Sequence, residues 1–238
     1  MNTRRRCILS SQDFKDNFVK GMQDYPDWTQ FMRKGQAALL VIDAQNDVLK
    51  EEGNLSIWCV WKHAQENRSV DNIKSIVVAC RKASIPIFWI RQLRLAGGRD
   101  VFPGTFDGFR IAFYRKTIPD FQLEGTWQVE IIDELKDLID NKDIIIDKAG
   151  SSSFEGTNLN RYLVQLGIKT LLLCGFITSA CVEATGRTGR ERGYLTVLIG
   201  DACASRCEEE QRSALERYTW IIGPAVTTNL LIELLKSW

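Results

Sequence analysis

Apolar segments of strand length recur along the chain and alternate with stretches of helical spacing. Residues 37–42 (AALLVI) are apolar without a break, which is typical of a central parallel strand covered on both faces. Further segments of similar character predict strands at 85–90, 143–147, 169–174 and 194–199, with a short last strand at 225–228. The chain therefore contains the strands of one sizeable sheet.

The stretches between these segments carry the helical pattern. In residues 70–83 the apolar side chains of Val70, Ile73, Ile76, Val77 and Cys80 share one helical face. The pattern predicts further helices leading up to 138, at 157–166, from 178 or 179 to 192, at 208–220 and at 229–238. Alternation of strands and helices predicts an α/β fold: a doubly wound, mostly parallel sheet with right-handed crossovers and helices on both faces.

Two stretches do not fit this alternation. Residues 1–36 form a predicted N-terminal arm, whose spaced aromatic side chains we expect to dock on the body or on a neighbouring subunit, and residues 37–238 form a single domain. Residues 93–122 make a long connection with several glycines and aromatic residues. Long connections in compact domains are commonly functional lids, and the aromatic content favours a packed lid, with a plain surface excursion as the alternative.

Composition narrows the class of protein. Of the 238 residues, 45% are hydrophobic and 26% are charged, and the net charge of +1 gives no field that would attract nucleic acid or an acidic membrane. The N-terminus leads into polar sequence without a secretory leader, and no apolar run has membrane-spanning length. Seven cysteines without CxxC spacing indicate reduced thiols and a cytoplasmic protein. The single histidine, His63, argues against a His-rich metal site and a Cys–His catalytic pair.

Three ionisable residues follow or end three predicted strands: Asp43, Lys148 and Cys181. The carboxyl ends of parallel strands form one crevice, so these side chains can converge. Cys181 falls in the first turn of a predicted helix, where unpaired N–H groups and the helix dipole favour a thiolate. Taken singly, Cys181 could be a small buried hydrophobe and Asp43 a loop cap.

Together the three residues suit nucleophilic catalysis. Cys181 would attack an sp² carbon, while Asp43 takes and returns a proton. Lys148 would keep the carboxylate ionised and lower the thiol pKa. Backbone N–H groups of the turn at 177–181 would hold the oxyanion.

Three stretches of the sequence, VIDAQNDVL, DKAGSSSFEGTNL and GFITSACVEATGRTGRERGY, resemble the signature motifs of the isochorismatase-like cysteine hydrolase family. The resemblance runs from about residue 37 to the C-terminus. It implies the Rossmann-like, isochorismatase-like hydrolase fold, with Cys181 as nucleophile, Asp43 as general base and Lys148 between them. It also implies a non-proline cis peptide between Phe176 and Ile177, and a supporting role for Gln45.

The family includes nicotinamidases, N-carbamoylsarcosine amidohydrolases, biuret hydrolases and ureidoacrylate amidohydrolases. Its nicotinamidases bind a metal through an Asp and histidines, whereas this chain has only His63, so we expect no metal and no cofactor. Isochorismatases proper lack the cysteine, so enol-ether cleavage is not expected. The stretch GTWQVEIIDEL and the polar loop at 151–153 look most like the branch that acts on ureido or carbamoyl amides.

The resulting expectation is an amidohydrolase that cleaves a small ureido or carbamoyl amide through a thioester on Cys181 and releases ammonia. The alternatives are hydrolysis of a maleamate- or nicotinamide-like amide, and a non-catalytic binding protein. Expected partners are a small amide substrate and further copies of the chain in a dimer or tetramer, but no nucleic acid or membrane. The candidate site residues beyond the three reactive ones are the oxyanion turn Phe176, Ile177 and Thr178, and the substrate-binding set Gln45, Arg91, Gln92, Trp127 and Phe154, for which core or lid packing is the alternative.

Overall fold

The computed structural model describes residues 27–102 and 104–238, and the chain divides into two units at residues 32 and 33. Of the first unit, only a short 3-10 helix, η1 (Trp28–Phe31), and its flanks are described. The predicted docking of an arm at 1–36 lies largely outside the described residues and stays a prediction, as does the division of the chain at residue 37. The fold below is that of the second unit.

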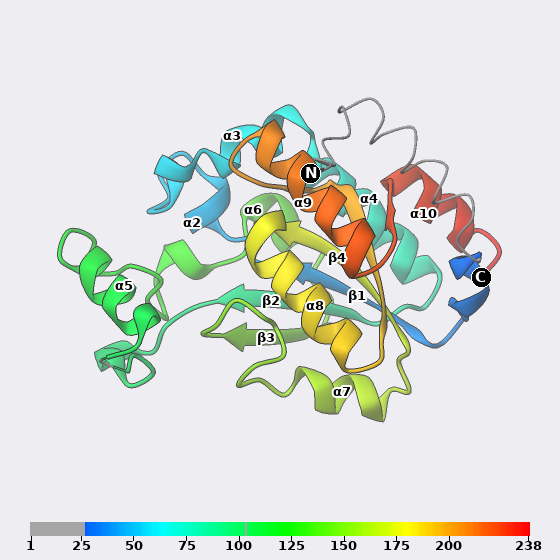
Figure 1. The fold of residues 1–238 in the computed structure, drawn as a ribbon, viewed down its shortest axis with the longest axis horizontal. Helices are drawn as coiled ribbons and strands as arrows, with labels where there is room; N and C mark the ends of the chain where they lie inside the picture. Colours follow the sequence, from blue (N-terminus) through cyan, green and yellow to red (C-terminus); the bar gives the residue numbers. More distant parts are fainter. Residues whose placement is uncertain (1–26, 103) are drawn as a thin grey trace, which may run out of the picture. The chain divides into compact units, whose positions relative to one another are not determined.

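A six-stranded, all-parallel sheet forms the centre of the described part of the chain. Its strands in chain order are β1 (Ala37–Ile42), β2 (Ile87–Gln92), β3 (Ile144–Lys148), β4 (Thr170–Phe176), β5 (Leu195–Ala204) and β6 (Ala225–Val226). Their spatial order is β3-β2-β1-β4-β5-β6 (Figure 1). This is the doubly wound order, in which strands are added to one side of β1 up to β3 and to the other side from β4 onwards. The predicted α/β fold class is confirmed.

Helices cover both faces of the sheet. The helices are α2 (Asn46–Leu49), α3 (Val60–Glu66), α4 (Ser69–Lys82), α5 (Phe106–Arg115), α6 (Asp133–Lys136), α7 (Leu159–Gln165), α8 (Glu183–Glu191), α9 (Glu208–Ile221) and α10 (Thr228–Leu235). Short 3-10 turns η2 (Ser56–Trp58), η3 (Ala96–Gly98) and η4 (Trp127–Val129) and a π-helical turn η5 (Thr178–Val182) connect them. Helices α4 and α10 pack together on one face, and α8 lies on the other with α9 beside it (Figure 1).

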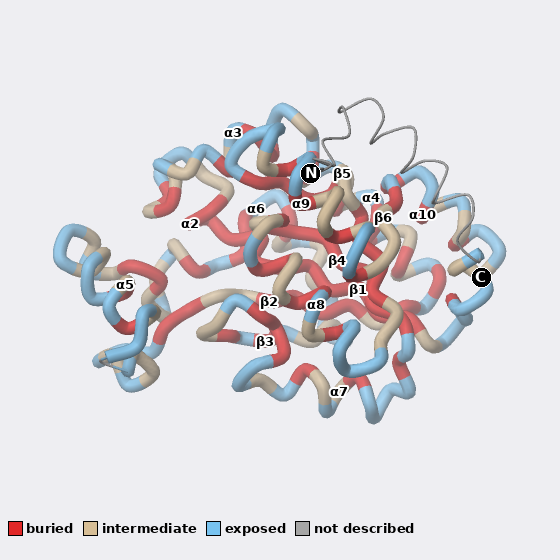
Figure 2. Tube along the Cα trace, in the orientation of Figure 1, coloured by how far each residue is buried: buried red, intermediate tan, exposed pale blue. Residues whose placement is uncertain are grey.

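The two central strands are the most deeply buried part of the fold. Every residue of β1 and of β4 is buried, as expected for strands covered by helices on both faces (Figure 2). At Gly175 the two strands approach so closely that a Cβ atom would lie 2.0 Å from the carbonyl oxygen of Ile42. Gly175 also has a φ of +119°, a conformation that only glycine adopts readily. The end of β1, and with it Asp43, is therefore set directly against the end of β4.

Several predicted boundaries are corrected. Strand β2 begins two residues later than expected and extends through Arg91 and Gln92, which were predicted to follow it. Gly175 lies inside β4 and is not a turn, because the strand continues to Phe176. The predicted helix at 178–192 begins as the π-helical turn η5 and becomes an α-helix only at Glu183. The stretch at 51–69, where no helix is predicted, contains α3, and the long connection at 93–122 contains α5.

Candidate active site

The three reactive residues predicted from the sequence meet at the point where the strand order reverses. Asp43 directly follows β1, Lys148 is the last residue of β3, and Cys181 lies in η5, which follows β4. Because parallel strands end at one edge of the sheet, residues far apart in the sequence face a common crevice there. Asp43 has a left-handed φ of +50°, which turns the chain sharply out of the strand.

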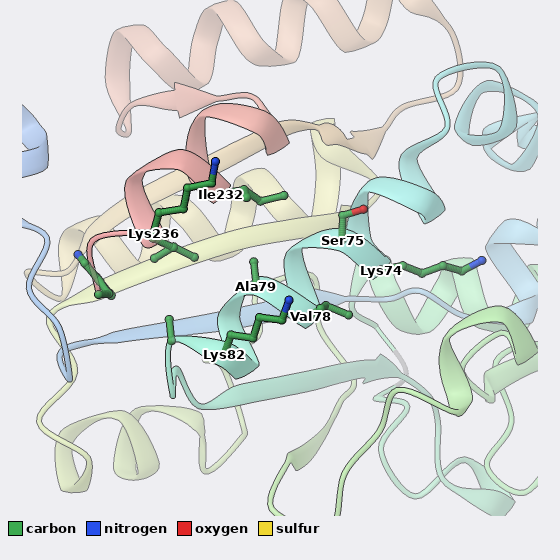
Figure 3. Close-up of a pocket in the computed structure, with 10 residues that line it drawn as sticks. Lys74, Ser75, Val78, Ala79, Lys82, Ile232 and Lys236 are labelled. Carbon is green, nitrogen blue, oxygen red and sulfur yellow. The ribbon is translucent and has the colours of Figure 1, made fainter.

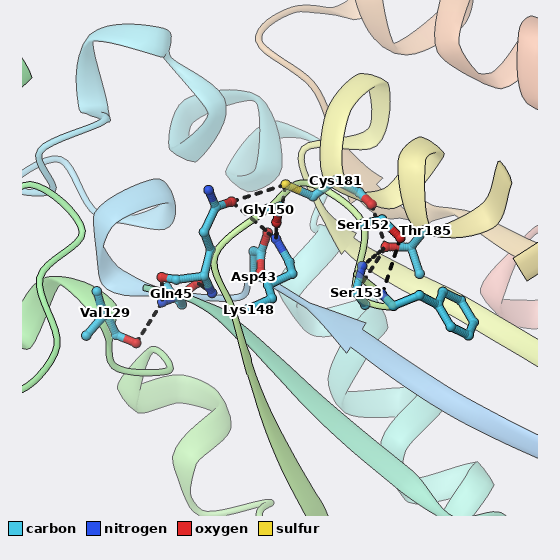
Figure 4. Close-up of polar contacts among 11 residues, drawn as sticks. Asp43, Gln45, Val129, Lys148, Gly150, Ser152, Ser153, Cys181 and Thr185 are labelled. Carbon is cyan, nitrogen blue, oxygen red and sulfur yellow. Dashed lines mark hydrogen bonds and ion pairs between the residues drawn. The ribbon is translucent and has the colours of Figure 1, made fainter. Parts of the chain in front are cut away.

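Lys148 is the centre of this group (Figure 4). Its Nζ lies 2.8 Å from Oδ2 of Asp43 and 3.3 Å from Sγ of Cys181. The same Nζ donates to the side-chain oxygen of Gln92 at 3.2 Å and to the carbonyl oxygen of Gly150 at 3.1 Å. Asp43, Lys148 and Cys181 are all buried. The ammonium group thus bridges a carboxylate and a sulfur atom away from bulk water.

The second oxygen of Asp43 is free to accept a proton. Oδ1 is buried and has no hydrogen-bond partner among the described residues. A buried carboxylate oxygen without a partner is unfavourable unless the site uses it. The carboxylate and the thiol both contact Nζ of Lys148, at 2.8 and 3.3 Å, so base and sulfur lie around the same ammonium group.

The electrostatics correct one expectation from the sequence. Burial raises the pKa of the Cys181 thiol to about 12; the positive charge of Lys148 opposes this shift, and the negative charge of Asp43 adds to it. Cys181 is therefore a thiol at neutral pH and not the predicted resting thiolate. The helix-dipole argument is wrong here, because Cys181 lies in a short π-helical turn where loss of hydration outweighs the nearby positive charge.

Burial also opposes charge on the other two groups, but their pairing stabilises it. Loss of hydration raises the pKa of Asp43, and the ammonium of Lys148 acts against that shift. For Lys148, burial lowers the pKa, but the attraction of Asp43 and Cys181 outweighs burial and the pKa is raised. Lys148 is thus held as a cation, and its charge supports an ionised Asp43.

A cavity of about 130 Å³ opens onto Cys181. It is lined by Asp43, Gln45, Asp47, Val48, Leu55, Trp58, Gln92, Arg110, Gln122, Ser151, Phe176, Ile177, Ala180 and Cys181. A larger hollow of about 670 Å³ lies between α4 and α10, where lysine and apolar side chains line it (Figure 3). None of the three reactive residues lines that hollow, so the smaller cavity is the candidate active site.

The predicted turn before Cys181 borders the cavity. Phe176 and Ile177 line it, and the peptide bond between them is cis, at the position that the family resemblance implied. The carbonyl oxygen of Ile177 accepts from the N–H groups of Ala180 and Val182. The hydroxyl of Thr178 donates to the side-chain oxygen of Gln211 at 2.6 Å, which ties the turn to α9.

Two of the predicted substrate-binding residues also lie at the cavity. The side-chain oxygen of Gln92 is 3.3 Å from Sγ of Cys181, so Gln92 contacts the reacting group itself. The amide nitrogen of Gln45 donates to the carbonyl oxygens of Gln92 and Val129, and its oxygen accepts from the Gln92 N–H. Gln45 therefore braces the end of β2, and its side chain has little capacity left for a ligand.

The structure places Arg91, Trp127 and Phe154 outside the cavity, which corrects their assignment as substrate-binding candidates. Adjacent residues of a strand point to opposite faces, so Gln92 and its register partner Lys148 face the site while Arg91 pairs with Asp147 on the other side at 2.8 Å. The carbonyl oxygen of Trp127 accepts from the Asn46 side chain, while its indole is largely exposed.

Phe154 is a packing residue. Its buried ring stacks on Tyr194 with the centroids 6.0 Å apart, and the guanidinium of Arg192 lies over it. In the polar loop at 151–153, only Ser151 lines the cavity. The hydroxyl of Ser153 instead hydrogen-bonds to that of Thr185, so this part of the loop is tied to α8 (Figure 4).

Sequence reasoning missed four polar or aromatic residues of the cavity wall: Asp47, Trp58, Arg110 and Gln122. Asp47 could have been predicted from the sequence, because it belongs to the motif VIDAQNDVL and follows Asp43 closely. The other three come from the connections at 51–69 and 93–122, where the sequence did not show which side chains turn inward.

The predicted packed lid is corrected in part. Tyr114 stacks on the buried Phe121 with centroids 4.7 Å apart, so one side of the connection packs as expected. Phe102 and three phenylalanines of α5 are nevertheless exposed, namely Phe106, Phe109 and Phe113. These three recur at helical spacing on one face of α5, which leaves an apolar stripe open to solvent.

His63 does not take part in the site. Its ring lies 3.1 Å from the carbonyl oxygen of Ser205 and 2.7 Å from the side chain of Asn67. Over residues 27–102 and 104–238, no three His, Cys, Asp or Glu side chains are grouped as metal ligands would be. Within the same ranges, none of the helices is both long and apolar enough to cross a membrane.

The chain is similar to proteins of known sequence and structure. A ureidoacrylate amidohydrolase, RutB, from Acinetobacter baylyi is 33% identical over 177 residues, which are 71% of this chain and 70% of the relative. Nicotinamidase 3 from Arabidopsis thaliana is 27% identical over 179 residues, or 75% of this chain and 78% of the relative. A cysteine hydrolase structure from Pseudomonas syringae pv. phaseolicola has the same fold, with a TM-score of 0.72 and 24% identity over 87% of this chain and 95% of the other.

The family model described as the isochorismatase domain matches residues 37–229, from the first residue of β1 into α10. That range contains Asp43, Lys148, Cys181 and every residue that lines the cavity. The resemblance seen in the three sequence motifs is therefore confirmed, and the chain belongs to the isochorismatase family.

Proposed function

We propose that the protein is an amidohydrolase that cleaves the C–N bond of a small ureido or carbamoyl amide through a covalent intermediate on Cys181. The observation that carries this proposal is the position of Lys148 Nζ, 2.8 Å from Asp43 and 3.3 Å from Cys181, beside a cavity that reaches the sulfur atom. The presence of Asp43, Lys148 and Cys181 together argues against a non-catalytic protein that keeps the fold only to bind ligands.

The first half of the reaction begins from a neutral thiol. As Sγ of Cys181 attacks the amide carbon, its proton passes to the unpartnered Oδ1 of Asp43. Lys148 stabilises the negative charge that moves between sulfur and carboxylate. Asp43 then returns the proton to the leaving nitrogen, the C–N bond breaks, ammonia departs, and an acyl or carbamoyl thioester remains on Cys181.

The second half reverses these roles. Asp43 takes a proton from a water molecule that attacks the thioester carbon, and the sulfur leaves and regains a proton. In both halves the carbonyl oxygen becomes negatively charged. We assign its stabilisation to backbone N–H groups of the turn at 177–181 other than that of Ala180, which donates to Ile177, since Ile177 and Cys181 border the cavity.

The choice of a ureido or carbamoyl substrate is supported by the polar wall of the cavity and by the relatives. Gln92, Gln122 and Ser151 offer both donors and acceptors to a compact molecule with several N–H and C=O groups. A protein named ureidoacrylate amidohydrolase is among the relatives at 33% identity. A maleamate- or nicotinamide-like amide is the alternative substrate, and a relative named nicotinamidase keeps the latter open.

A substrate panel tests the proposal. Ammonia release is measured at one enzyme concentration from biuret, ureidoacrylate, N-carbamoylglycine, maleamate and nicotinamide, with Cys181→Ser as the inactive control. We expect at least one of the first three to be hydrolysed much faster than the last two. Preference for maleamate or nicotinamide would contradict the ureido assignment but retain a cysteine amidohydrolase. Equal turnover by the Cys181→Ser variant would contradict the mechanism itself.

A further inference from the structure

Arg110 is the one arginine or lysine among the described residues that line the active-site cavity. It belongs to α5, in the connection between β2 and β3, and its side chain is about one-third exposed. No step of the proposed reaction uses it. A cationic side chain that lines a small reactive cavity is suited to bind an anionic group of a ligand.

The position of Arg110 is fixed from the protein side. Its Nη2 donates to Oδ1 of Asp107 at 3.0 Å, three residues earlier on the same helix. The other oxygen of Asp107 accepts from Nη2 of Arg94, which is buried. Arg94 also lies 3.9 Å from Asp100. A buried arginine therefore holds the aspartate, and the aspartate holds Arg110 at the cavity.

This arrangement leaves most of the Arg110 guanidinium free. A guanidinium has five N–H donors, and within the described residues only the contact to Asp107 engages them. Arginine typically pairs with carboxylates through two parallel N–H···O bonds, which need a free edge of the guanidinium plane. A side chain held at one nitrogen and free at the others is prepared for such a pair.

The carboxylates of the cavity do not neutralise Arg110. Asp43 is already paired with Lys148 at 2.8 Å. Asp47 makes no ion pair with Arg110, and burial raises its pKa to about 7, so near neutral pH much of it is uncharged. The charge of Arg110 is therefore shared only with Asp107, which Arg94 also contacts.

We propose that Arg110 binds a carboxylate of the substrate and so selects amides that carry an anionic group away from the scissile C–N bond. The cavity of about 130 Å³ joins this cation to Cys181 and restricts the molecule between them to a compact one. This inference rests on the proposed function for the amide, whereas the carboxylate follows from Arg110 alone. Arg110 is then a specificity-determining residue.

Pairs of amides that differ in charge and little else test this role. N-Carbamoylglycine is compared with N-carbamoylglycinamide, and maleamate with maleamide, in the wild type and in Arg110→Gln and Arg110→Lys. A matched control is Arg99→Gln, because Arg99 lies in the same connection and is exposed but does not line the cavity.

The wild type should favour the anionic member of a hydrolysed pair. In Arg110→Gln we expect KM for the anion to rise about 10- to 100-fold, the usual range for losing a charge-assisted hydrogen bond or two, with the neutral amide changed less than about twofold. Arg110→Lys should recover part of the loss, because it keeps the charge but not the paired donors. Arg99→Gln should behave as the wild type.

Equal losses for anionic and neutral amides in Arg110→Gln, or a wild type without preference for the anion, would overturn the proposal. Turnover of the maleamate pair alone, with an anion preference that needs Arg110, would refute the ureido assignment and leave the carboxylate site standing. If no pair is hydrolysed, calorimetric binding of the four compounds decides, and binding that ignores their charge refutes the role of Arg110.

Discussion

Replacing Asp47 by asparagine should make the protein more stable at neutral and alkaline pH. Asp47 is buried at the cavity wall, and neither of its oxygens has a hydrogen bond of good geometry among the described residues, although the backbone N–H groups of Asn54 and Leu55 offset part of the cost of burial. Loss of hydration raises its pKa from the ordinary value of 3.8 to about 7. The folded state therefore favours the protonated carboxyl group, and charge on Asp47 opposes folding.

The sign and size of the effect follow from linkage. Below pH 4 the carboxyl group is protonated in both states, and the raised pKa has no destabilising effect. As pH rises from about 4 to about 7, the unfolded chain releases the proton and the folded chain retains it, so the free energy of unfolding falls. A shift of about 3 units corresponds to about 4 kcal/mol lost by pH 8, at about 1.4 kcal/mol per pH unit.

Asparagine has nearly the same shape and carries no charge at any of these pH values. The difference in unfolding free energy between Asp47→Asn and the wild type should therefore increase from pH 4 to pH 7 and become constant above pH 8. Urea unfolding followed by tryptophan fluorescence at several pH values measures it, and other titrating groups cancel in the difference. Asn in place of the exposed Asp137 is the matched control. A difference that does not change with pH, or that falls as pH rises, would refute the reasoning.

The other predictions concern the reactive group and its support. Because burial holds the Cys181 pKa near 12, iodoacetamide should alkylate Cys181 about tenfold faster for each unit of pH between 8 and 10. Lys148→Ala should slow this alkylation further, and peptide mass spectrometry separates Cys181 from the exposed Cys59 and Cys207. A rate of Cys181 alkylation that Lys148→Ala leaves unchanged would make Lys148 merely structural. Asp43→Asn should lower kcat at least ~10²-fold, measured as ammonia release, and near-normal turnover would remove Asp43 as the base. Enzymatic activity should survive exhaustive chelation. Loss of activity with EDTA and its recovery with zinc would favour a metal-dependent nicotinamidase instead. Gly175→Ala should lower the free energy of unfolding by several kcal/mol, measured by urea unfolding, because the new Cβ would lie 2.0 Å from the carbonyl oxygen of Ile42. Gly167 also has a positive φ, but nothing lies within 4 Å of an added Cβ, so Gly167→Ala should lower it by only about 1–2 kcal/mol.

The sequence predicted the residues that lie on regular elements. The unbroken apolar run at 37–42 identified β1, and the position of Asp43 directly after it followed. Lys148 and Cys181 were found in the same way, from the strands that precede them. These predictions succeed because burial on both faces leaves an unbroken apolar run in the sequence and because parallel strands end together.

The prediction failed where side-chain direction depends on tertiary packing. Arg91 and Gln92 are adjacent in the sequence, and only the register of β2 against β3 shows that Gln92 faces the site while Arg91 faces Asp147. Arg110 lies on α5, a helix that was not predicted, and a buried arginine 16 positions earlier contacts the aspartate that holds it in place. Local residue preferences predict neither the direction of the Gln92 side chain nor the position of Arg110.

In the proposed mechanism, the raised pKa of the Cys181 thiol explains why the site needs a carboxylate near the sulfur. A resting thiolate could attack without help, but a thiol whose pKa is raised to about 12 must lose its proton as the bond to carbon forms. Only a base beside the sulfur can take that proton, and the buried, unpartnered Oδ1 of Asp43 meets the requirement. Lys148 contacts both groups, so its charge remains favourable wherever the proton resides. On this proposal, burial keeps Cys181 protonated until it attacks, and the geometry of the three side chains matters more for reactivity than the acidity of the thiol.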